Sequence, residues 1–262
     1  MSRPWVVVLG ASSGFGAASA RAFARQGYGV FGAHMDRRGA MPAVDALIAE
    51  LKSYDVPVLF QNGNAADDEL RAASMATLKD AVTADGGHVR VLLHSLAFGT
   101  LRPYFADESP LSRRQLEMTL DVMANSLVYW TQDLVKSGLL GQGGRVYAMT
   151  SAGSIVAWPS YGAVSAAKSA LESHVRQLAV ELAPKGITAN AIMAGVTLTP
   201  ALEKIPGSDV LAAAALKHNP HGRLTTPEDV ASCLTVLARA ETAWLTGNVI
   251  RLDGGETISG SA

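Results

Sequence analysis

The residues best suited to proton chemistry are Tyr161 and Lys168, in a run over residues 160–178 with helical character. They stand seven positions apart, which is two helical turns less about 20°, so both side chains leave one helix face. Their separation along the axis is about 10 Å, over which long side chains can converge on one bound molecule. A phenol beside an ammonium is a proton donor held in a positive field. The alternative to a catalytic pair, when these two residues are taken alone, is an amphipathic helix that carries an interfacial tyrosine and a solvated lysine.

The elements that would position this pair follow from an alternation of short apolar runs with longer helical patterns. The expected strands are residues 5–9, 30–34, 57–61, 89–94, 144–150, 188–193 and 248–252. The expected helices are residues 14–26, 41–54, 69–85, 113–139, 160–183, a mobile piece at 208–217, and 227–240. Strands apolar on both faces indicate a parallel sheet covered by helices. Right-handed crossovers then predict an α/β fold, a doubly wound, Rossmann-like sheet in a single domain over residues 1–262.

Composition excludes several classes of function. The 262 residues carry a net charge of −1 without a basic block, so we expect no nucleic-acid partner. The single cysteine, Cys233, predicts neither an internal disulfide nor a metal cluster. No apolar run reaches the roughly 20 residues that span a bilayer, and the N-terminus has no signal-peptide layout. We therefore expect a soluble cytoplasmic protein without a membrane partner.

A glycine-rich turn separates the first expected strand from the first expected helix. It contains Gly10, Ser12, Ser13, Gly14, Phe15 and Gly16. Glycine permits the tight turn and close backbone approach, and the helix N-terminus offers free N–H groups to a pyrophosphate. The spacing Gly-x-x-x-Gly-x-Gly differs from the dinucleotide fingerprint Gly-x-Gly-x-x-Gly. It resembles the glycine motif of the short-chain dehydrogenase/reductase family, which implies a nicotinamide cofactor.

This resemblance covers almost the whole chain. Asn64-Ala65 stands where the family usually has Asp-Val beside the adenine, and Leu252-Asp253-Gly254-Gly255 resembles the closing strand and turn. Ala194-Gly195 resembles the segment whose backbone meets the nicotinamide carboxamide, and Thr197 and Thr199 follow within reach of the carboxamide or a phosphate. The resemblance also implies cofactor contacts by the residues after the fourth strand, Ser95, Leu96 and Ala97.

The choice between NADPH and NADH depends on the end of the second strand. The position of the acidic residue that grips a ribose 2′-hydroxyl falls on His34, and Asp36, Arg37 and Arg38 follow. Two adjacent arginines are suited to a 2′-phosphate, whereas Asp36 favours NADH. A solvated turn is the alternative for the arginines. The sequence favours NADPH and leaves NADH open.

The spacing Tyr-x6-Lys replaces the family's common Tyr-x-x-x-Lys and resembles a divergent branch, the enoyl-acyl-carrier-protein reductases of bacterial fatty-acid synthesis. His94-Ser95-Leu96-Ala97 and Met193-Ala194-Gly195 resemble the same branch. Met123 stands where the common carbonyl reductases carry a catalytic asparagine. The glycine turn keeps the common spacing, and a subgroup of enoyl reductases combines the two features.

The resemblance implies reduction of the C2–C3 double bond of a 2-enoyl thioester, on acyl carrier protein, by a homotetramer. Tyr161 would stabilise the enolate oxygen and Lys168 would bind the nicotinamide ribose. Ser151 would add a hydrogen bond, or would only satisfy backbone at a strand end. Residues 199–224, with small apolar side chains between Pro and Gly, predict a lid over the acyl chain, a surface loop being the alternative.

Other functions remain open. Within the same family they are an enoyl-CoA or dienoyl-CoA reductase and a carbonyl reductase of 3-oxoacyl or hydroxysteroid type. A non-catalytic cofactor-binding regulator is a different class, which Met123 favours and the Tyr161–Lys168 pair opposes.

Overall fold

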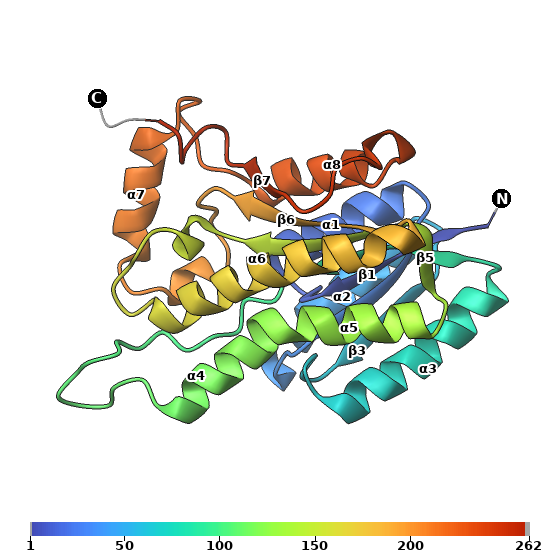
Figure 1. Cartoon of the computed structure of the whole chain (residues 1–262), viewed down its shortest axis with the longest axis horizontal. Helices are drawn as coiled ribbons and strands as arrows, with labels where there is room; N and C mark the ends of the chain where they lie inside the picture. The colour runs from blue at the N-terminus through green and yellow to red at the C-terminus, as the bar shows by residue number, and fades with distance from the viewer. Residues whose placement is uncertain (1, 260–262) are drawn as a thin grey trace.

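A seven-stranded parallel sheet forms the centre of the computed structural model, which describes residues 2–259 (Figure 1). The strands are β1 Pro4–Leu9, β2 Gly29–His34, β3 Val58–Asn62, β4 His88–His94, β5 Leu140–Thr150, β6 Thr188–Ala194 and β7 Val249–Leu252. The helices are α1 Gly14–Arg25, α2 Met41–Lys52, α3 Asp68–Ala84, α4 Arg113–Leu120, α5 Ser126–Lys136, α6 Gly162–Leu182, α7 Ser208–His218 and α8 Pro227–Leu237. The strand order is β3-β2-β1-β4-β5-β6-β7, so the predicted doubly wound α/β fold is confirmed.

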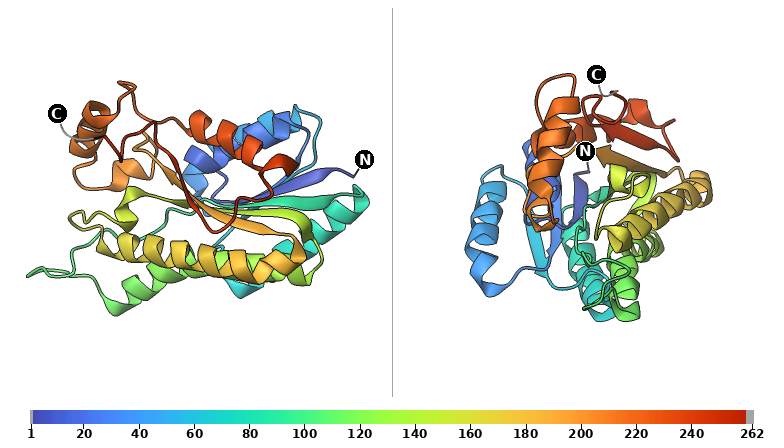
Figure 2. Two further views of the ribbon diagram at one scale, coloured as in Figure 1. Left: turned by 45° about the horizontal axis from the view of Figure 1, so that its top comes forward. Right: turned by 90° about the vertical axis from the view of Figure 1, so that its left-hand side faces the viewer.

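The apolar strands serve two cores, one on each face of the sheet. In β1, Trp5, Val7 and Leu9 enter one core while Val6 and Val8 enter the other. This alternation follows from the two-residue period of a strand, and burial on both faces explains the nearly continuous apolar run. Figure 2 shows α1 and α8 on one face of the sheet and α5 and α6 on the other.

The order of the strands reverses beside β1. From β1 the chain proceeds outward to β2 and β3, then returns to β4 on the other side. In open α/β sheets the crevice for ligands lies at the carboxyl ends of the strands at such a point. The turns after β1 and β4 meet there, where the Ser95 N–H donates to the Leu9 carbonyl at 2.8 Å.

The helix expected over 113–139 is present, but it contains a π-helical turn and ends at Lys136. A π-helical turn, Asp121–Asn125, separates α4 from α5, and α5 ends at Lys136. The Ser126 hydroxyl donates to the Val122 carbonyl at 2.7 Å and also lies 2.9 Å from Nε2 of the buried His94. Serine side chains that bond back to the preceding turn bend helices, and periodicity alone does not reveal the partner on β4.

Two smaller boundaries also differ from expectation. Helix α6 begins at Gly162, because Ser160 has a left-handed φ of 62° that no helix can include. Strand β5 begins four positions before Gly144, at Leu140, and its pairing with β4 shifts register between Val89 and Val91. Within the described residues no helix is both long and apolar enough to cross a membrane.

Candidate active site

The glycine turn after β1 has no room for side chains at two positions. A Cβ on Gly10 would lie 2.5 Å from the Ser95 carbonyl oxygen, and one on Gly16 would lie 2.0 Å from the Gly10 carbonyl oxygen. Gly10 also has a φ of 86°, in the left-handed region. The first turn of α1 has no acidic residue, and its N-cap, Ser13, makes no side-chain capping bond. An anion would therefore meet free N–H groups and the positive end of the helix dipole, which fits a dinucleotide pyrophosphate.

The segment after β6 faces this turn. A Cβ on Gly14 would lie 3.3 Å from the Thr199 methyl group, so Thr199 stands across from the glycine turn. The Thr199 hydroxyl accepts from the Leu202 N–H at 3.3 Å, and the Thr197 hydroxyl donates to the Gly195 carbonyl at 2.9 Å. The predicted cofactor residues that share the carboxyl edge of the sheet are Gly10, Ser12, Ser13, Gly14, Phe15, Gly16, Asn64, Ala65, Ser95, Leu96, Ala97, Ala194, Gly195, Thr197 and Thr199.

The two arginines after β2 are exposed, and among residues 2–259 neither forms an ion pair. Asp36 beside them is engaged: its carboxylate lies 2.9 Å from Nδ1 of His34, and its backbone exchanges hydrogen bonds with the Asn62 side chain. Arg37 and Arg38 thus present guanidinium groups to solvent while the neighbouring carboxylate is held by the protein.

Tyr161 lies at the N-cap of α6, and its ring meets the loop after β5. Its hydroxyl is 3.5 Å from the Ser151 hydroxyl, and the ring leaves no room for a side chain on Gly153, where a Cβ would lie 2.4 Å from it. Burial raises the pKa of Tyr161, and the contact with Ser151 only partly opposes this. The phenol therefore remains a proton donor through the neutral range.

Lys168 is buried two turns further along α6. Its ammonium donates to the Met149 carbonyl at 2.7 Å, and burial lowers the pKa of Lys168 to about 8 against the opposing effect of Glu172. A buried ammonium with a single hydrogen bond retains two donors for a ligand. The pair predicted from sequence is thus held by the start and the second turn of α6, beside the end of β5.

The position next to Tyr161 at which the common carbonyl reductases carry an asparagine is occupied by an apolar residue. Met123, in the π-helical turn, packs in one cluster with Val164 and Ala167 of α6 and with Tyr161 itself. His94 lies behind this turn, and burial lowers its pKa to about 3. The neutral imidazole adds no second positive charge near Lys168.

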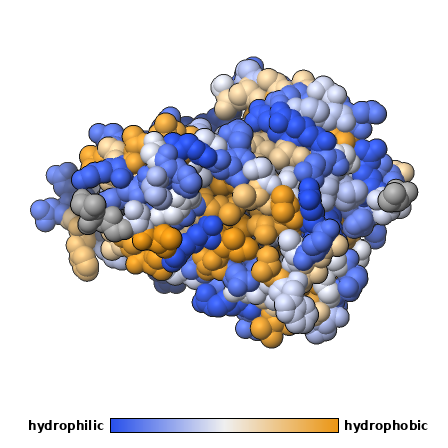
Figure 3. All heavy atoms as spheres, turned by 90° about the horizontal axis from the view of Figure 1, so that it is seen from above, coloured by the Kyte–Doolittle hydropathy of each residue, from blue (hydrophilic) through white to orange (hydrophobic). Residues whose placement is uncertain are grey.

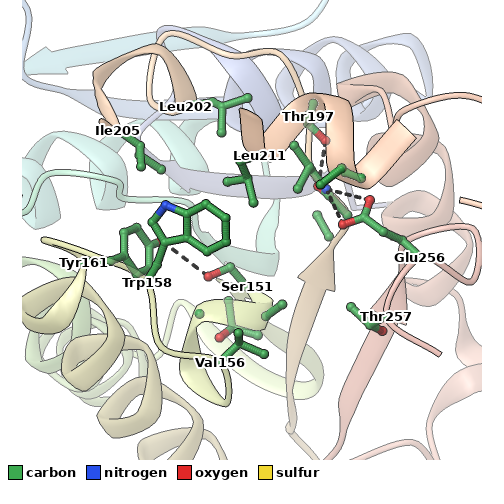
Figure 4. Close-up of a pocket in the computed structure, with 18 of the residues that line it drawn as sticks. Ser151, Val156, Trp158, Tyr161, Thr197, Leu202, Ile205, Leu211, Glu256 and Thr257 are labelled. Carbon is green, nitrogen blue, oxygen red and sulfur yellow. Dashed lines mark hydrogen bonds between the residues drawn. The ribbon is translucent and has the colours of Figure 1, made fainter. Parts of the chain in front are cut away.

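A cavity of about 460 Å³ opens in front of Tyr161, within the ~300–1,000 Å³ range of small-molecule sites. Figure 4 shows Tyr161, Trp158 and Ser151 on one side of it and Thr197, Glu256 and Thr257 on the other. The 199–224 segment supplies Leu202, Ile205 and Leu211, so it covers the cavity as a lid would. Whether this segment moves stays a prediction.

Trp158 and Glu256 are among the residues of this cavity that sequence reasoning missed. Trp158 lines the side that holds Tyr161. Both carboxylate oxygens of Glu256 accept from the Val196 N–H, at 3.0 and 3.3 Å. Glu256 follows the Asp253-Gly254-Gly255 turn directly, and this adjacency is the one signal in the sequence that could have drawn attention to it.

Several known proteins resemble this chain in architecture and in sequence. The sequence model of a family described as "Enoyl-(Acyl carrier protein) reductase" matches residues 10–257. The chain belongs to this branch of the short-chain dehydrogenase/reductase family. It is 27% identical over 230 residues to the enoyl-[acyl-carrier-protein] reductase [NADH] of Aquifex aeolicus, across 87% of this chain and 83% of that protein. The crystal structure of the Aquifex enzyme covers 99% of this chain and 98% of its own at 25% identity, with a TM-score of 0.83.

A relative named for a different activity is at least as similar in sequence. The D-threitol dehydrogenase of Mycolicibacterium smegmatis is 31% identical over 255 residues, across 96% of this chain and 92% of that protein. This chain is therefore a member of a family of oxidoreductases, and its resemblance to enoyl reductases is confirmed. Its relatives act on more than one class of substrate.

Proposed function

We propose that this protein reduces the C2–C3 double bond of a 2-enoyl thioester with NADPH, the acyl group being carried on acyl carrier protein. The observation that carries this proposal is the site at the start of α6. Tyr161, seven positions before Lys168, presents its hydroxyl to an apolar cavity with only a 3.5 Å contact to Ser151, and Met123 stands where a polar relay would be needed for carbonyl chemistry.

The chain's own residues then have distinct roles. The nicotinamide, when bound, would supply a hydride to the β-carbon, and a proton drawn from water would add at the α-carbon of the resulting enolate. The Tyr161 hydroxyl donates a hydrogen bond to the thioester oxygen as negative charge develops on it. A donor aimed at such charge in a site that excludes water typically contributes about 2.7–4 kcal/mol. The buried Lys168 ammonium would bind the ribose hydroxyls with the two donors that its bond to Met149 leaves free, and its charge would favour the developing enolate. Ser151 orients the phenol through their contact.

NADPH is our proposed cofactor because of the turn after β2. Arg37 and Arg38 are exposed, whereas the Asp36 carboxylate that would grip a 2′-hydroxyl is bonded to His34. Guanidinium groups recognise phosphate through paired hydrogen bonds. Replacing both arginines by alanine should raise KM for NADPH at least tenfold and leave KM for NADH nearly unchanged. A larger effect on NADH would reverse the assignment.

The reaction is tested by NADPH oxidation with crotonyl thioester and, separately, with acetoacetyl thioester, each on acyl carrier protein and on coenzyme A. We expect turnover with the enoyl substrate and faster turnover on the carrier protein. Consumption of NADPH with the keto substrate alone would overturn the proposal. Cofactor binding without turnover of either thioester would favour a regulator.

A carbonyl or alcohol dehydrogenase is the second candidate. The contact between Ser151 and Tyr161 suits a carbonyl oxygen as well as an enolate, and the relative from Mycolicibacterium smegmatis is named for a polyol. NADP⁺-dependent oxidation of small polyols, with no reduction of crotonyl thioester, would establish this candidate instead.

We also propose a homo-oligomer, with the tetramer as the expected form. Strand β7 lies at the edge of the sheet, and the face that carries α7, α8 and β7 gathers apolar side chains at its middle (Figure 3). Val236, Trp244, Leu245 and Val249 are exposed on or beside these elements. Light scattering on wild type and on Trp244→Glu tests whether this face joins subunits. A wild-type monomer would rule it out.

A further inference from the structure

Helix α6 carries a half-buried carboxylate that the proposed chemistry does not use. Glu172 follows Lys168 by four positions, so the two side chains leave the same face of the helix. The Glu172 carboxylate accepts a hydrogen bond from the Thr150 hydroxyl at 2.6 Å. Thr150 is the last residue of β5, is only 4% exposed and lines the cavity in front of Tyr161. Glu172 therefore connects α6 to the strand end that forms part of the site.

Two consecutive residues of β5 are bonded to this face of α6. The Met149 carbonyl accepts from the Lys168 ammonium at 2.7 Å, and the Thr150 hydroxyl donates to Glu172. Ser151 comes next in the chain, and its hydroxyl lies 3.5 Å from that of Tyr161. A shift of this strand end would therefore disturb both the contact of Lys168 and the contact between Ser151 and Tyr161. Hydrogen bonds to a carboxylate are roughly twice as strong as neutral ones, which suits a bond that must hold this end in place.

Glu172 also acts on the charge of Lys168. Burial lowers the pKa of Lys168 to about 8, and the charge of Glu172 opposes that shift. His94, on β4, is neutral because burial lowers its pKa to about 3, and Tyr161 is neutral because burial raises its pKa. Asp121, in the π-helical turn, accepts a hydrogen bond from a tyrosine of α5. Within residues 2–259, Glu172 is thus the carboxylate that favours the charged form of Lys168.

The carboxylate achieves this without occupying a donor of the ammonium. Among the described residues Lys168 forms no ion pair, because the Glu172 carboxylate is held by Thr150 instead. A carboxylate in direct contact would take one of the two donors that the bond to Met149 leaves free. At its observed place it favours the charge and leaves both donors to a ligand.

We propose that Glu172 is a positioning residue of the cofactor site, which fixes the end of β5 on α6 through Thr150 and keeps the Lys168 ammonium charged. This inference rests on the proposed role of Lys168 as the ligand of the nicotinamide ribose. It does not depend on which substrate is reduced.

The pH dependence of NADPH binding tests the effect of the charge. The dissociation constant is measured by fluorescence titration of the full chain, without a thioester, from about pH 7 to about pH 10. Glu172→Gln removes the charge and keeps an acceptor oxygen for Thr150. The pH at which wild-type affinity begins to fall should move down by roughly one unit in this variant, because the ammonium loses the carboxylate that favours it. In the background of Lys168→Met, Glu172→Gln should have no effect on the profile.

Two other variants separate the hydrogen bond from the charge. Thr150→Val removes the bond and keeps the carboxylate, so the pH profile should stay near wild type, while amide hydrogen exchange over residues 149–154 should become faster. In Glu172→Gln that exchange should change little. Glu181→Gln is the matched control, an exposed carboxylate further along α6, and should change neither measurement.

The outcomes distinguish this inference from the proposed function. Identical pH profiles for wild type and Glu172→Gln, or an equal shift in Glu181→Gln, would overturn the role of the charge. Unchanged hydrogen exchange in Thr150→Val would overturn the role in holding β5. If Glu172→Gln does not fold, Glu172→Asp replaces it: this variant keeps the charge but is too short for the bond, so its exchange should be faster and its profile near wild type. A failure to reduce crotonyl thioester would overturn the enoyl reaction and leave these results standing, because neither measurement uses a substrate.

Discussion

Two phenol–cation pairs lie along β5, and their environments are opposite. In the first, Tyr147 and Arg145 project from the strand itself and meet the end of α8. The Tyr147 hydroxyl donates to the Leu237 carbonyl at 2.5 Å, and the Arg145 guanidinium donates to the carbonyls of Gly143 at 2.8 Å and Arg239 at 3.0 Å. The last carbonyls of a helix have no partners within the helix, so the Tyr147 hydroxyl satisfies the one at Leu237, the last residue of α8.

In the second pair, Tyr161 and Lys168 come from α6 and meet the carboxyl end of β5. The phenol has one long contact, to Ser151, and the ammonium has one hydrogen bond, to the Met149 carbonyl. Burial raises the pKa of both phenols and lowers the pKa of both cations, so burial does not distinguish the pairs. What differs is donor capacity. The Tyr147 hydroxyl and the terminal nitrogens of Arg145 donate to backbone carbonyls, whereas the Tyr161 hydroxyl lines the cavity and the Lys168 ammonium makes one hydrogen bond only.

The strongest test of this difference is the removal of each hydroxyl. Tyr161→Phe should lower kcat by about two to three orders of magnitude, because the enolate loses its donor. Its unfolding free energy and its NADPH affinity should stay near wild type. The measurements are steady-state turnover, fluorescence titration with NADPH, and urea unfolding.

Tyr147→Phe is the matched control and should show the reverse pattern. Loss of the bond to Leu237 should cost about 1 kcal/mol of stability with kcat unchanged. Equal losses of turnover and cofactor affinity in Tyr161→Phe would instead mean that Tyr161 has a structural role like that of Tyr147.

Removing the two cations should separate the pairs again, with a smaller effect. Arg145→Met leaves the carbonyls of Gly143 and Arg239 without this donor and should lower the free energy of unfolding by about 2 kcal/mol. Lys168→Met removes a buried charge with only one hydrogen bond, so its stability should equal or exceed that of wild type. Urea unfolding of both variants measures the contrast. Equal destabilisation would show that Lys168, too, is chiefly structural.

Much of this site was predictable because its signals are local. The glycine turn, the strand before it and the helix after it are contiguous, and backbone geometry there depends on glycine alone. Tyr161 caps α6 and Lys168 lies within it, so the seven-residue spacing was enough to predict that both side chains lie on the same side of the helix. The helix was expected from Ser160, however, and begins at Gly162 because the left-handed Ser160 depends on the loop after β5.

The remainder depended on contacts between distant segments. Glu256 lines the cavity and accepts from the Val196 N–H because β7 lies beside β6 in the sheet. The two residues are 60 positions apart in the sequence. The π-helical turn at Asp121–Asn125 likewise reflects a bond between Ser126 and His94. Periodicity within a segment carries no information about such partners.

A pH dependence should appear in the second pair alone. Burial lowers the pKa of Lys168 to about 8, so the ammonium that we propose as the ribose ligand is lost as pH rises through that value, while the raised pKa of Tyr161 keeps the phenol protonated. The ratio kcat/KM for NADPH should fall up to about tenfold per pH unit above about 8.

Stability should move in the opposite direction. Between about 8 and the unfolded value of about 10.4 the unfolded chain binds the extra proton, so the free energy of unfolding rises with pH. Lys168→Met should remove both dependences, and Arg145→Met should remove neither. A wild-type profile that stays flat to pH of about 10 would mean that the Lys168 ammonium is stabilised as well as any exposed lysine, and the contrast between the two pairs would then rest on Tyr161 alone.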